Sequence, residues 1–307
     1  MIVDAHMHIW RELNGQIAGK IPVVPLGNGM IRIGQTPLLG MPASHLDCSA
    51  RAQWALSEFD AAGVDAGVVV QEYMDGEQND YVLKTRQNAP DRWVVHGLPN
   101  FWEKDCVADE ARTLLDRGFD GIKLPGGHLA AANVALDDSE FIPVYEQIAE
   151  RDRVLAVDLS EGEGQVAAME NILSHLPKLK VSIGHFGMPN RKGWPGQLHL
   201  CRHENVYLET GGIIWLYRKE GYPFHGALTA IHKAKQDVGI EKLMWGSDWP
   251  RTMVDFTYRQ SLDFIRQADT TLSEGEKKLL LGENAARLYR LKPPVIDRKP
   301  AALITDG

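Results

Sequence analysis

Short apolar runs rich in valine, isoleucine and leucine recur along the chain. They cover residues 2–8, 67–71, 93–98, 121–124, 154–158, 181–185, 206–210 and 243–248. Each run is nearly continuous in apolar character instead of alternating, which is typical of parallel strands that are covered on both faces. The pattern therefore indicates eight strands of a parallel sheet.

Segments with the apolar spacing of helices separate these runs. They cover residues 52–62, 80–88, 108–117, 140–151, 165–176, 224–236 and 258–267. Ser273, with Glu276 three residues further on, marks one more helix start. About eight strand–helix units in a chain of this length predict an α/β protein, a single (β/α)8 TIM-type barrel with its helices outside.

Two stretches depart from the alternation and define the expected domain organisation. Residues 10–50 are rich in glycine and proline and show no clear periodicity. A first βα loop of that length is usually functional, so we expect a lid or a binding loop. We assign residues 1–291 to the barrel with this insertion, and residues 292–307 to a proline-rich C-terminal tail.

Nearly every apolar run carries or ends in a polar or ionisable side chain. The carboxyl ends of barrel strands form one rim, so these residues are expected to meet at one mouth. A carboxylate in a run such as 243–249 is costly to bury unless a cation or hydrogen bonds compensate it. The residues concerned are His6, His8, Gln71, Glu72, His96, Lys123, Asp158, His185, Glu209, Thr210 and Asp248.

His6 and His8 are the most informative pair among these residues. Side chains two positions apart on a strand point to the same side, so both imidazoles are expected in the mouth. Imidazole is a common ligand of divalent transition metals, and a metal site needs at least a third protein ligand. Asp248 is the best candidate, because it is anionic and lies at the end of the last strand.

Three motifs carry a resemblance to a known family: Asp4-Ala5-His6-Met7-His8, Gly184-His185-Phe186-Gly187 and Gly246-Ser247-Asp248-Trp249-Pro250. Together with Gly282-Glu283-Asn284-Ala285 they resemble the amidohydrolase superfamily. The closest likeness is to its amidohydrolase-related branch of sugar and dicarboxylate lactonases and metal-dependent decarboxylases. The resemblance spans residues 4–289 and implies metal ligation by His6, His8 and Asp248, with His185 beside the metal or the substrate.

One position departs from the family pattern. Metal-dependent members usually have a histidine ligand at the end of the fifth strand, where this chain has Asp158. Asp158 could ligate the metal through oxygen, or it could mark a metal-free member of the branch. Lys123 invites comparison with the carboxylated lysine of two-metal relatives, but the branch commonly has Lys or Arg there without such a bridge. We therefore expect one divalent ion, zinc before manganese, with a metal-free enzyme as the alternative.

Substrate recognition is expected from cationic and polar residues around the mouth. Arg251 follows Asp248, Arg218 follows the seventh strand, and His128 and Lys123 belong to the fourth strand and its loop. An arginine pairs well with a carboxylate or with neighbouring oxygens. Glu72 and Glu209 receive no role from the sequence.

The composition of the chain limits the kinds of partner that it can bind. The net charge of −8 argues against nucleic acid or an anionic membrane, which leaves a small-molecule substrate. Three cysteines without close spacing and an N-terminus unlike a signal peptide predict a cytoplasmic protein. No apolar run approaches the about 20 residues needed to cross a bilayer. A homo-oligomer is compatible with a barrel of this kind.

The preferred function is a lactonase that opens a small sugar-acid or carboxylated lactone. A metal-activated water would attack the carbonyl, with Asp248 as its base and His185 or Lys123 stabilising the oxyanion. Three alternatives stay open: a metal-dependent decarboxylase, a metal-independent lactonase, and a non-catalytic barrel that binds a small molecule.

Overall fold

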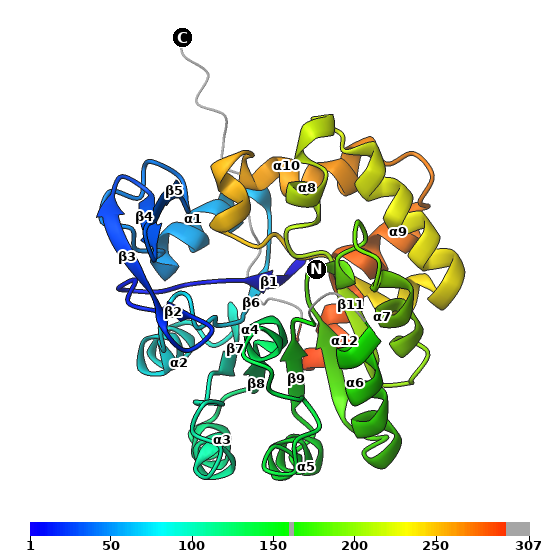
Figure 1. The fold of residues 1–307 in the computed structure, drawn as a ribbon. Coiled ribbons are helices and arrows are strands. Elements are labelled where there is room, and N and C mark those ends of the chain that lie inside the picture. Colours follow the sequence, from blue (N-terminus) through cyan, green and yellow to red (C-terminus); the bar gives the residue numbers. More distant parts are fainter. Residues whose placement is uncertain (160–162, 293–307) are drawn as a thin grey trace.

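Eight parallel strands form the centre of the protein (Figure 1). The computed structural model describes residues 1–159 and 163–292. Neighbours in the sheet follow one another in the order β1-β6-β7-β8-β9-β10-β11-β12. The strands are β1 Val3–Met7, β6 Ala66–Val69, β7 Trp93–Gly97, β8 Gly121–Leu124, β9 Val154–Val157, β10 Lys180–Ile183, β11 Val206–Glu209 and β12 Leu243–Met244.

Main-chain hydrogen bonds join the last strand segment to the first. The Ala5 N–H donates to the Trp245 carbonyl, and the Asp248 N–H donates to the His6 carbonyl, each over 2.8 Å. Met7 and Trp249 also form a parallel bridge. The sheet therefore closes on itself, and the prediction of a single (β/α)8 barrel with a long first βα loop is confirmed.

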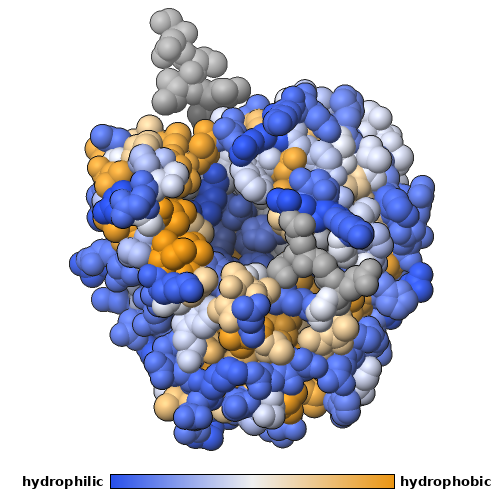
Figure 2. All heavy atoms as spheres, viewed as in Figure 1, coloured by the Kyte–Doolittle hydropathy of each residue, from blue (hydrophilic) through white to orange (hydrophobic). Residues whose placement is uncertain are grey.

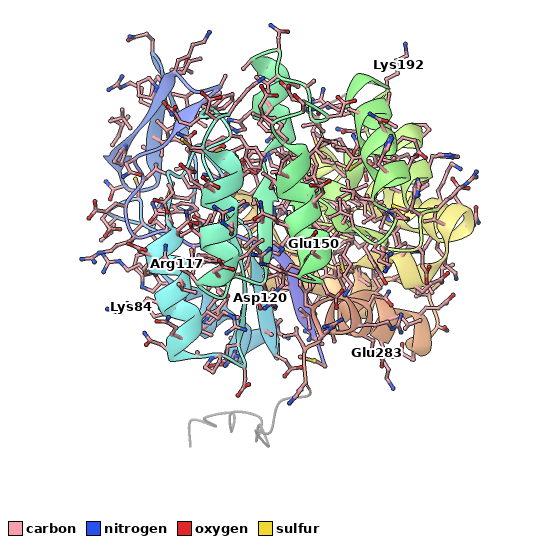
Figure 3. All side chains as sticks on the ribbon, turned by 90° about the horizontal axis from the view of Figure 1, so that it is seen from below. Lys84, Arg117, Asp120, Glu150, Lys192 and Glu283 are labelled. Atoms are coloured by element: carbon pink, nitrogen blue, oxygen red, sulfur yellow. The ribbon has the colours of Figure 1, made fainter. Side chains whose placement is uncertain are left out.

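Helices surround the barrel, as the apolar spacing predicts, and their charged side chains, such as Lys84 and Glu150, point outward (Figure 3). Ser273 accepts a hydrogen bond from the Glu276 N–H while the Glu276 carboxylate accepts one from the Ser273 N–H, which confirms the expected helix start. The helices include α1 Ala52–Ala62, α2 Asn79–Asn88, α3 Val107–Asp116, α5 Ile142–Glu150, α6 Glu163–His175, α7 Trp194–Leu200, α9 His225–Val238, α10 Tyr258–Asp263, α11 Glu274–Lys278 and α12 Asn284–Tyr289.

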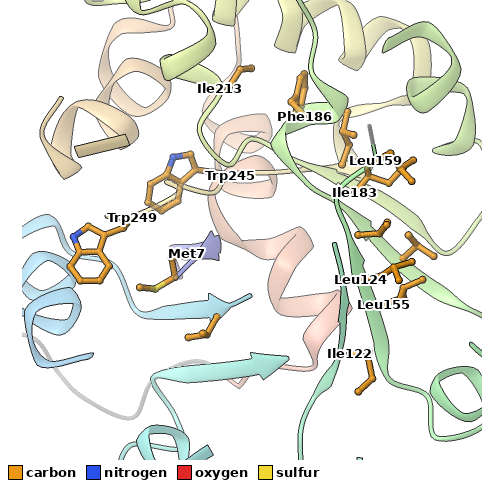
Figure 4. Packing of buried hydrophobic residues seen from close by; sticks show 14 of the residues in the cluster. Met7, Ile122, Leu124, Leu155, Leu159, Ile183, Phe186, Ile213, Trp245 and Trp249 are labelled. Atoms are coloured by element: carbon orange, nitrogen blue, oxygen red, sulfur yellow. The ribbon is translucent and has the colours of Figure 1, made fainter. Parts of the chain in front are cut away.

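The core lies mainly between the strands and the helices, with residues such as Ile122, Leu155 and Ile183 buried there (Figure 4). A smaller cluster inside the barrel contains Val94, Val154 and Leu288, and so joins the strands to α12. The cluster as a whole comprises Val3, Ala5, Val68, Val94, Val154, Met244, Ala285 and Leu288. The barrel interior is thus filled on the α12 side, which leaves the opposite end for polar residues.

The insertion between β1 and α1 is not the irregular loop that its composition indicated. It forms a four-stranded antiparallel sheet, β2-β3-β4-β5. The strands are β2 Gln16–Ile17, β3 Ile21–Gly27, β4 Met30–Ile33 and β5 Thr36–Leu39. Prolines within β3 and β5 obscured the strand pattern, because proline is depleted in strands. Its assignment as a lid stays a proposal, and the predicted tail lies, after residue 292, outside the described residues.

Within residues 1–159 and 163–292, no helix has both the length and the apolar character needed to cross a membrane.

Candidate active site

Three predicted ligand residues meet where β1 and β12 end. The His6 Nε2 and His8 Nε2 atoms are 3.2 Å apart, and His8 Nε2 lies 3.0 Å from Asp248 Oδ1. His6 Nε2 lies 3.9 Å from the same oxygen. All three side chains are buried. Figure 2 shows a hydrophilic hollow in the middle of the face viewed along the barrel.

The local backbone explains how β1 presents these groups. Strict alternation would put Asp4 on the same side as His6, but the register of β1 against β6 shifts between Asp4 and Met7. Asp4 instead accepts hydrogen bonds from the hydroxyls of Ser247 and Tyr258 of α10. This irregularity directs Asp4 toward the helices while both imidazoles keep to the mouth.

Asp248 adopts an unusual backbone conformation, with φ at +58°. A left-handed aspartate is tolerated better than most residues, and such conformations cluster at functional sites. Gly212 leaves space for the Asp248 side chain, because a Cβ atom on residue 212 would lie 2.8 Å from Asp248 Oδ2. Gly211 is equally restricted, since its Cβ would lie 2.6 Å from His6 Cγ. Glycines thus let the β11 loop approach the site closely.

Glu209, at the end of β11, fixes the orientation of His6. Its Oε1 lies 2.5 Å from His6 Nδ1, and both side chains are buried. A carboxylate can only accept, so Nδ1 carries the proton and Nε2 presents its lone pair to His8 and Asp248. This carboxylate–histidine arrangement is the usual support of a metal-binding imidazole.

The donor set fits a divalent cation. Metal bonds of 2.0–2.2 Å in a tetrahedral site hold ligand atoms roughly 3.3 Å apart, close to the separations of the three donors. His8 Nδ1 and Asp75 Oδ2 are both buried without a hydrogen bond, 3.7 Å from each other. If His8 Nε2 bound a cation, Nδ1 would carry the proton and face the Asp75 carboxylate. Burial also lowers the pKa of His8, which favours the neutral ligand form.

The charges around Asp248 set its ionisation. Burial alone would raise the pKa of Asp248, but the hydrogen bond from His8 and the charge of His185 lower it to about 2. Burial would likewise lower the pKa of His185, but the carboxylates of Asp158 and Asp248 raise it to about 9. His185 donates its Nδ1 proton to the Gly211 carbonyl over 2.9 Å, so its Nε2 faces Asp158 at 3.8 Å.

A second charged group lies beside this centre. Lys123 of β8 is almost fully buried and contacts both Asp158, after β9, and Glu72, after β6, with its Nζ 3.0 Å from Glu72 Oε1. Burial raises the pKa of Glu72 to about 8, and the charge of Asp158 adds to this while Lys123 opposes it. The Lys123 ammonium therefore lies between the Asp158 carboxylate and the carboxyl group of Glu72, and both hold it in place.

The predicted substrate residues have different surroundings. His128, in α4 (Gly126–Ala131), lies 3.6 Å from Glu72 Oε2 and accepts a hydrogen bond from the Ala18 N–H of the insertion. Arg251 pairs with the buried Asp75 and stacks over Trp10. Arg218 is half-exposed, pairs with Asp255 at 3.9 Å and stacks over Trp215.

The structure therefore brings together His6, His8, Lys123, Asp158, His185 and Asp248. Among the described residues, two groups have the geometry to hold a metal: one is His6, His8 and Asp248, and the other is His6, Asp158 and Glu209. Glu209, Glu72 and Asp75 were not assigned from the sequence. Glu209 and Glu72 lie at strand ends, and that position was the one feature of the sequence that could have identified them. Asp75 lies in a loop, so nothing in the sequence pointed to it.

Two residues of the predicted polar ring are structural. His96 is fully buried and its ring packs edge-on against Tyr289 of α12, with 5.6 Å between centroids. Burial lowers the pKa of His96 to about 4. Thr210 bridges β11 to the segment after β12 through the Gly246 N–H, over 3.0 Å.

A separate cavity of about 1010 Å³ lies beside the insertion, between the loop after β6 and α3, with Tyr73, Trp102 and Glu110 among its walls. It contains none of the residues assigned to the mouth.

The fold and the site define a (β/α)8-barrel enzyme with a His-x-His and aspartate centre. The amidohydrolase family model matches residues 3–291. The chain therefore belongs to the amidohydrolase family, as its motifs indicated, and the expectation of a hydrolase is confirmed.

Individual relatives are distant but extend over nearly the whole chain. An L-fucono-1,5-lactonase of Burkholderia multivorans (strain ATCC 17616 / 249) is 23% identical, and the match covers 95% of this chain and 97% of that protein. The structure of a probable 2-pyrone-4,6-dicarboxylic acid hydrolase from Acinetobacter baumannii, with citric acid bound, has a TM-score of 0.71 at 21% identity, covering 94% of this chain and 99% of the other.

A third relative has a different activity. The 5-carboxyvanillate decarboxylase of Novosphingobium aromaticivorans, in complex with manganese and a nitrobenzoic acid, has a TM-score of 0.58 at 17% identity. The match covers 78% of this chain and 80% of that one. At these identities, the two structural likenesses establish the fold alone.

Proposed function

We propose that this chain is a lactonase that hydrolyses a small cyclic ester with the help of one divalent metal ion, zinc before manganese. The observation that carries the proposal is the convergence of His6 Nε2, His8 Nε2 and Asp248 Oδ1, with Glu209 holding His6. The likeness to an L-fucono-1,5-lactonase over 95% of the chain supports the choice of a lactone.

The cation would be held by His6, His8 and Asp248 and would supply Lewis-acid polarisation of the ester carbonyl. The free oxygen of Asp248 is the base that takes the proton from the attacking water. His185 lies against His6, with 4.7 Å between ring centroids, and its Nε2 is placed to donate a hydrogen bond to the oxygen on which charge develops. Opening of the ring requires a proton on the leaving alkoxide, and His185, whose pKa is raised to about 9, carries one to give.

The charges of the mouth favour a neutral, hydroxyl-bearing lactone over a carboxylated one. Lys123 and Arg251, the cations expected to bind a substrate carboxylate, already pair with Glu72, Asp158 and Asp75. Those carboxylates accept hydrogen bonds, so they suit the hydroxyls of a sugar ring. A substrate carboxylate would meet the like charge of Asp158 there, which costs several kcal/mol.

A substrate panel tests this proposal. Purified protein supplied with zinc is assayed for acid release from neutral sugar 1,5- and 1,4-lactones and from a carboxylated lactone of the same ring size. We expect hydrolysis of at least one neutral lactone, with a kcat/KM at least about tenfold above that of the carboxylated one, because the like charge is then absent.

The same preparation is assayed for carbon dioxide release from hydroxylated aromatic carboxylic acids. Decarboxylation without lactone hydrolysis would replace the lactonase by a lyase. A preference for the carboxylated lactone would contradict the assignment of Glu72 and Asp158 as hydroxyl acceptors.

A further inference from the structure

The sheet of the insertion is apolar on both of its faces. Its register places Pro25, Ile31 and Leu38 in one row across β3, β4 and β5, of which Ile31 is fully buried while Pro25 and Leu38 are exposed. The neighbouring rows alternate to the other face. These outer rows are formed by Val24, Arg32 and Pro37, and by Met30 and Leu39, with Leu26 beside them.

A sheet with one solvated face normally carries polar side chains on that face. Here Arg32 is the one charged residue among the outer rows. Leu26 and Leu39 are 50% and 40% exposed. Of the seven large hydrophobic side chains exposed in the described chain, five lie in the insertion: Ile21, Leu26, Leu38, Leu39 and Leu46. Figure 2 shows this apolar surface where Figure 1 places β3 to β5.

The charge of the insertion differs from that of the rest of the chain. Over residues 10–50 its charged residues are Arg11, Glu12, Lys20, Arg32 and Asp47, and the two acidic ones lie outside the sheet. The insertion therefore contributes +1 to a chain of net charge −8, so the remainder carries −9. Depletion of charge together with exposed apolar side chains is what distinguishes the centre of a protein interface from ordinary surface.

We propose that the outer face of the β3–β4–β5 sheet packs against the same face of a second copy of this chain, across a two-fold axis. A two-fold interface requires a self-complementary surface, and a flat apolar sheet face with little charge meets that requirement. The strongly acidic remainder of the chain is a poor match for this face. Arg32 alone is also too little positive charge for a membrane surface, where clusters of Lys and Arg are typical.

The two sheets pack face to face instead of joining at their edges. Pro37 lies in β5, the free edge strand, and has no N–H to donate to a partner strand. The dimer would also brace the wall of the active site. The same insertion donates the Ala18 N–H to His128 and offers the Gly40 carbonyl to Arg251.

The test is the molecular mass in solution, measured by light scattering and sedimentation at about 1–100 µM. We expect twice the chain mass of 34.2 kDa for the wild type and the monomer mass for Leu39→Lys. The matched control is Trp215→Lys, because Trp215 is exposed to a similar extent, 42%, but lies in α8 (Ile213–Leu216). It should stay dimeric.

A monomeric wild type, or a dimer that Leu39→Lys leaves intact, would overturn the proposal, as would binding of the wild type to anionic vesicles through this face. If Leu39→Lys does not fold, hydrogen exchange of the wild-type protein tests the proposed dimer instead. Protection of the amides in residues 30–39 should rise with protein concentration, and exchange independent of concentration would contradict the dimer.

Discussion

Replacing Asp248 by asparagine is expected to lower kcat for lactone hydrolysis by about 10³–10⁴-fold, near the upper end of what a general base contributes. Asparagine has the same shape, so its Oδ1 can keep the place of the Asp248 oxygen, 3.0 Å from His8 Nε2, as a neutral ligand while the base is lost. The φ of +58° at this position is also tolerated by asparagine. The fold should therefore survive, and the loss should fall on kcat much more than on KM.

The measurement is steady-state kinetics of both proteins, supported by thermal melting. The matched control is Asp237→Asn, which changes an exposed ion pair with Lys233 at the end of α9 and should leave kcat unchanged. Turnover by Asp248→Asn within about threefold of the wild type would remove Asp248 from the role of base.

Replacing Lys123 by methionine is expected to destabilise the protein by about 3–5 kcal/mol, the usual cost of removing one partner of a buried ion pair. Lys123 is 1% exposed and serves both Glu72 and Asp158. Without the ammonium, two neighbouring carboxyl groups stay buried and are forced toward the protonated state. For a domain of this size, the melting temperature should fall by roughly 5–10 °C.

The dependence of the stability loss on pH shows whether the buried carboxyl groups cause it. Removal of Lys123 raises the folded-state pKa of Asp158 above its unfolded value, and it raises further the pKa of Glu72, which burial already brings to about 8. Such groups lose stability as pH rises through that range, so the deficit of Lys123→Met should grow between pH 5 and pH 8. The control is Lys104→Met, which removes a partly exposed ion pair with Asp138 and should cost less than about 1 kcal/mol. An equal loss in both variants would show that Lys123 is not a buried counter-ion.

The barrel and the convergence of polar residues at its mouth could be predicted because their signals are local. Near-continuous apolar strands and amphipathic helices fix the alternation, and strand ends meet at one rim in any parallel barrel. His6, His8, Asp158, His185 and Asp248 all stand at such ends, so topology alone predicted that they converge. Their individual roles stay predictions until the variants are measured.

Other features depend on contacts that no sequence spacing reveals. The pairing of Arg251 with Asp75 joins a loop after β6 to one after β12, and no sequence spacing reveals that this predicted substrate residue has an acidic partner. His96 shares the sequence context of a rim residue, yet α12 reaches it from the other end of the barrel. The insertion was misjudged because its strands are short and contain proline, and because the partner that would cover their outer face is not part of the chain.

Metal binding tests the central claim most directly. Zinc is titrated into chelator-treated protein in competition with a chromophoric chelator, for the wild type, for His8→Ala, and for His199→Ala, an exposed histidine of α7. The account predicts one tightly bound equivalent in the wild type and in His199→Ala, and an affinity at least about 100-fold weaker in His8→Ala. A wild type that binds no zinc, manganese or other divalent ion, or binding that His8→Ala leaves unchanged, would contradict it.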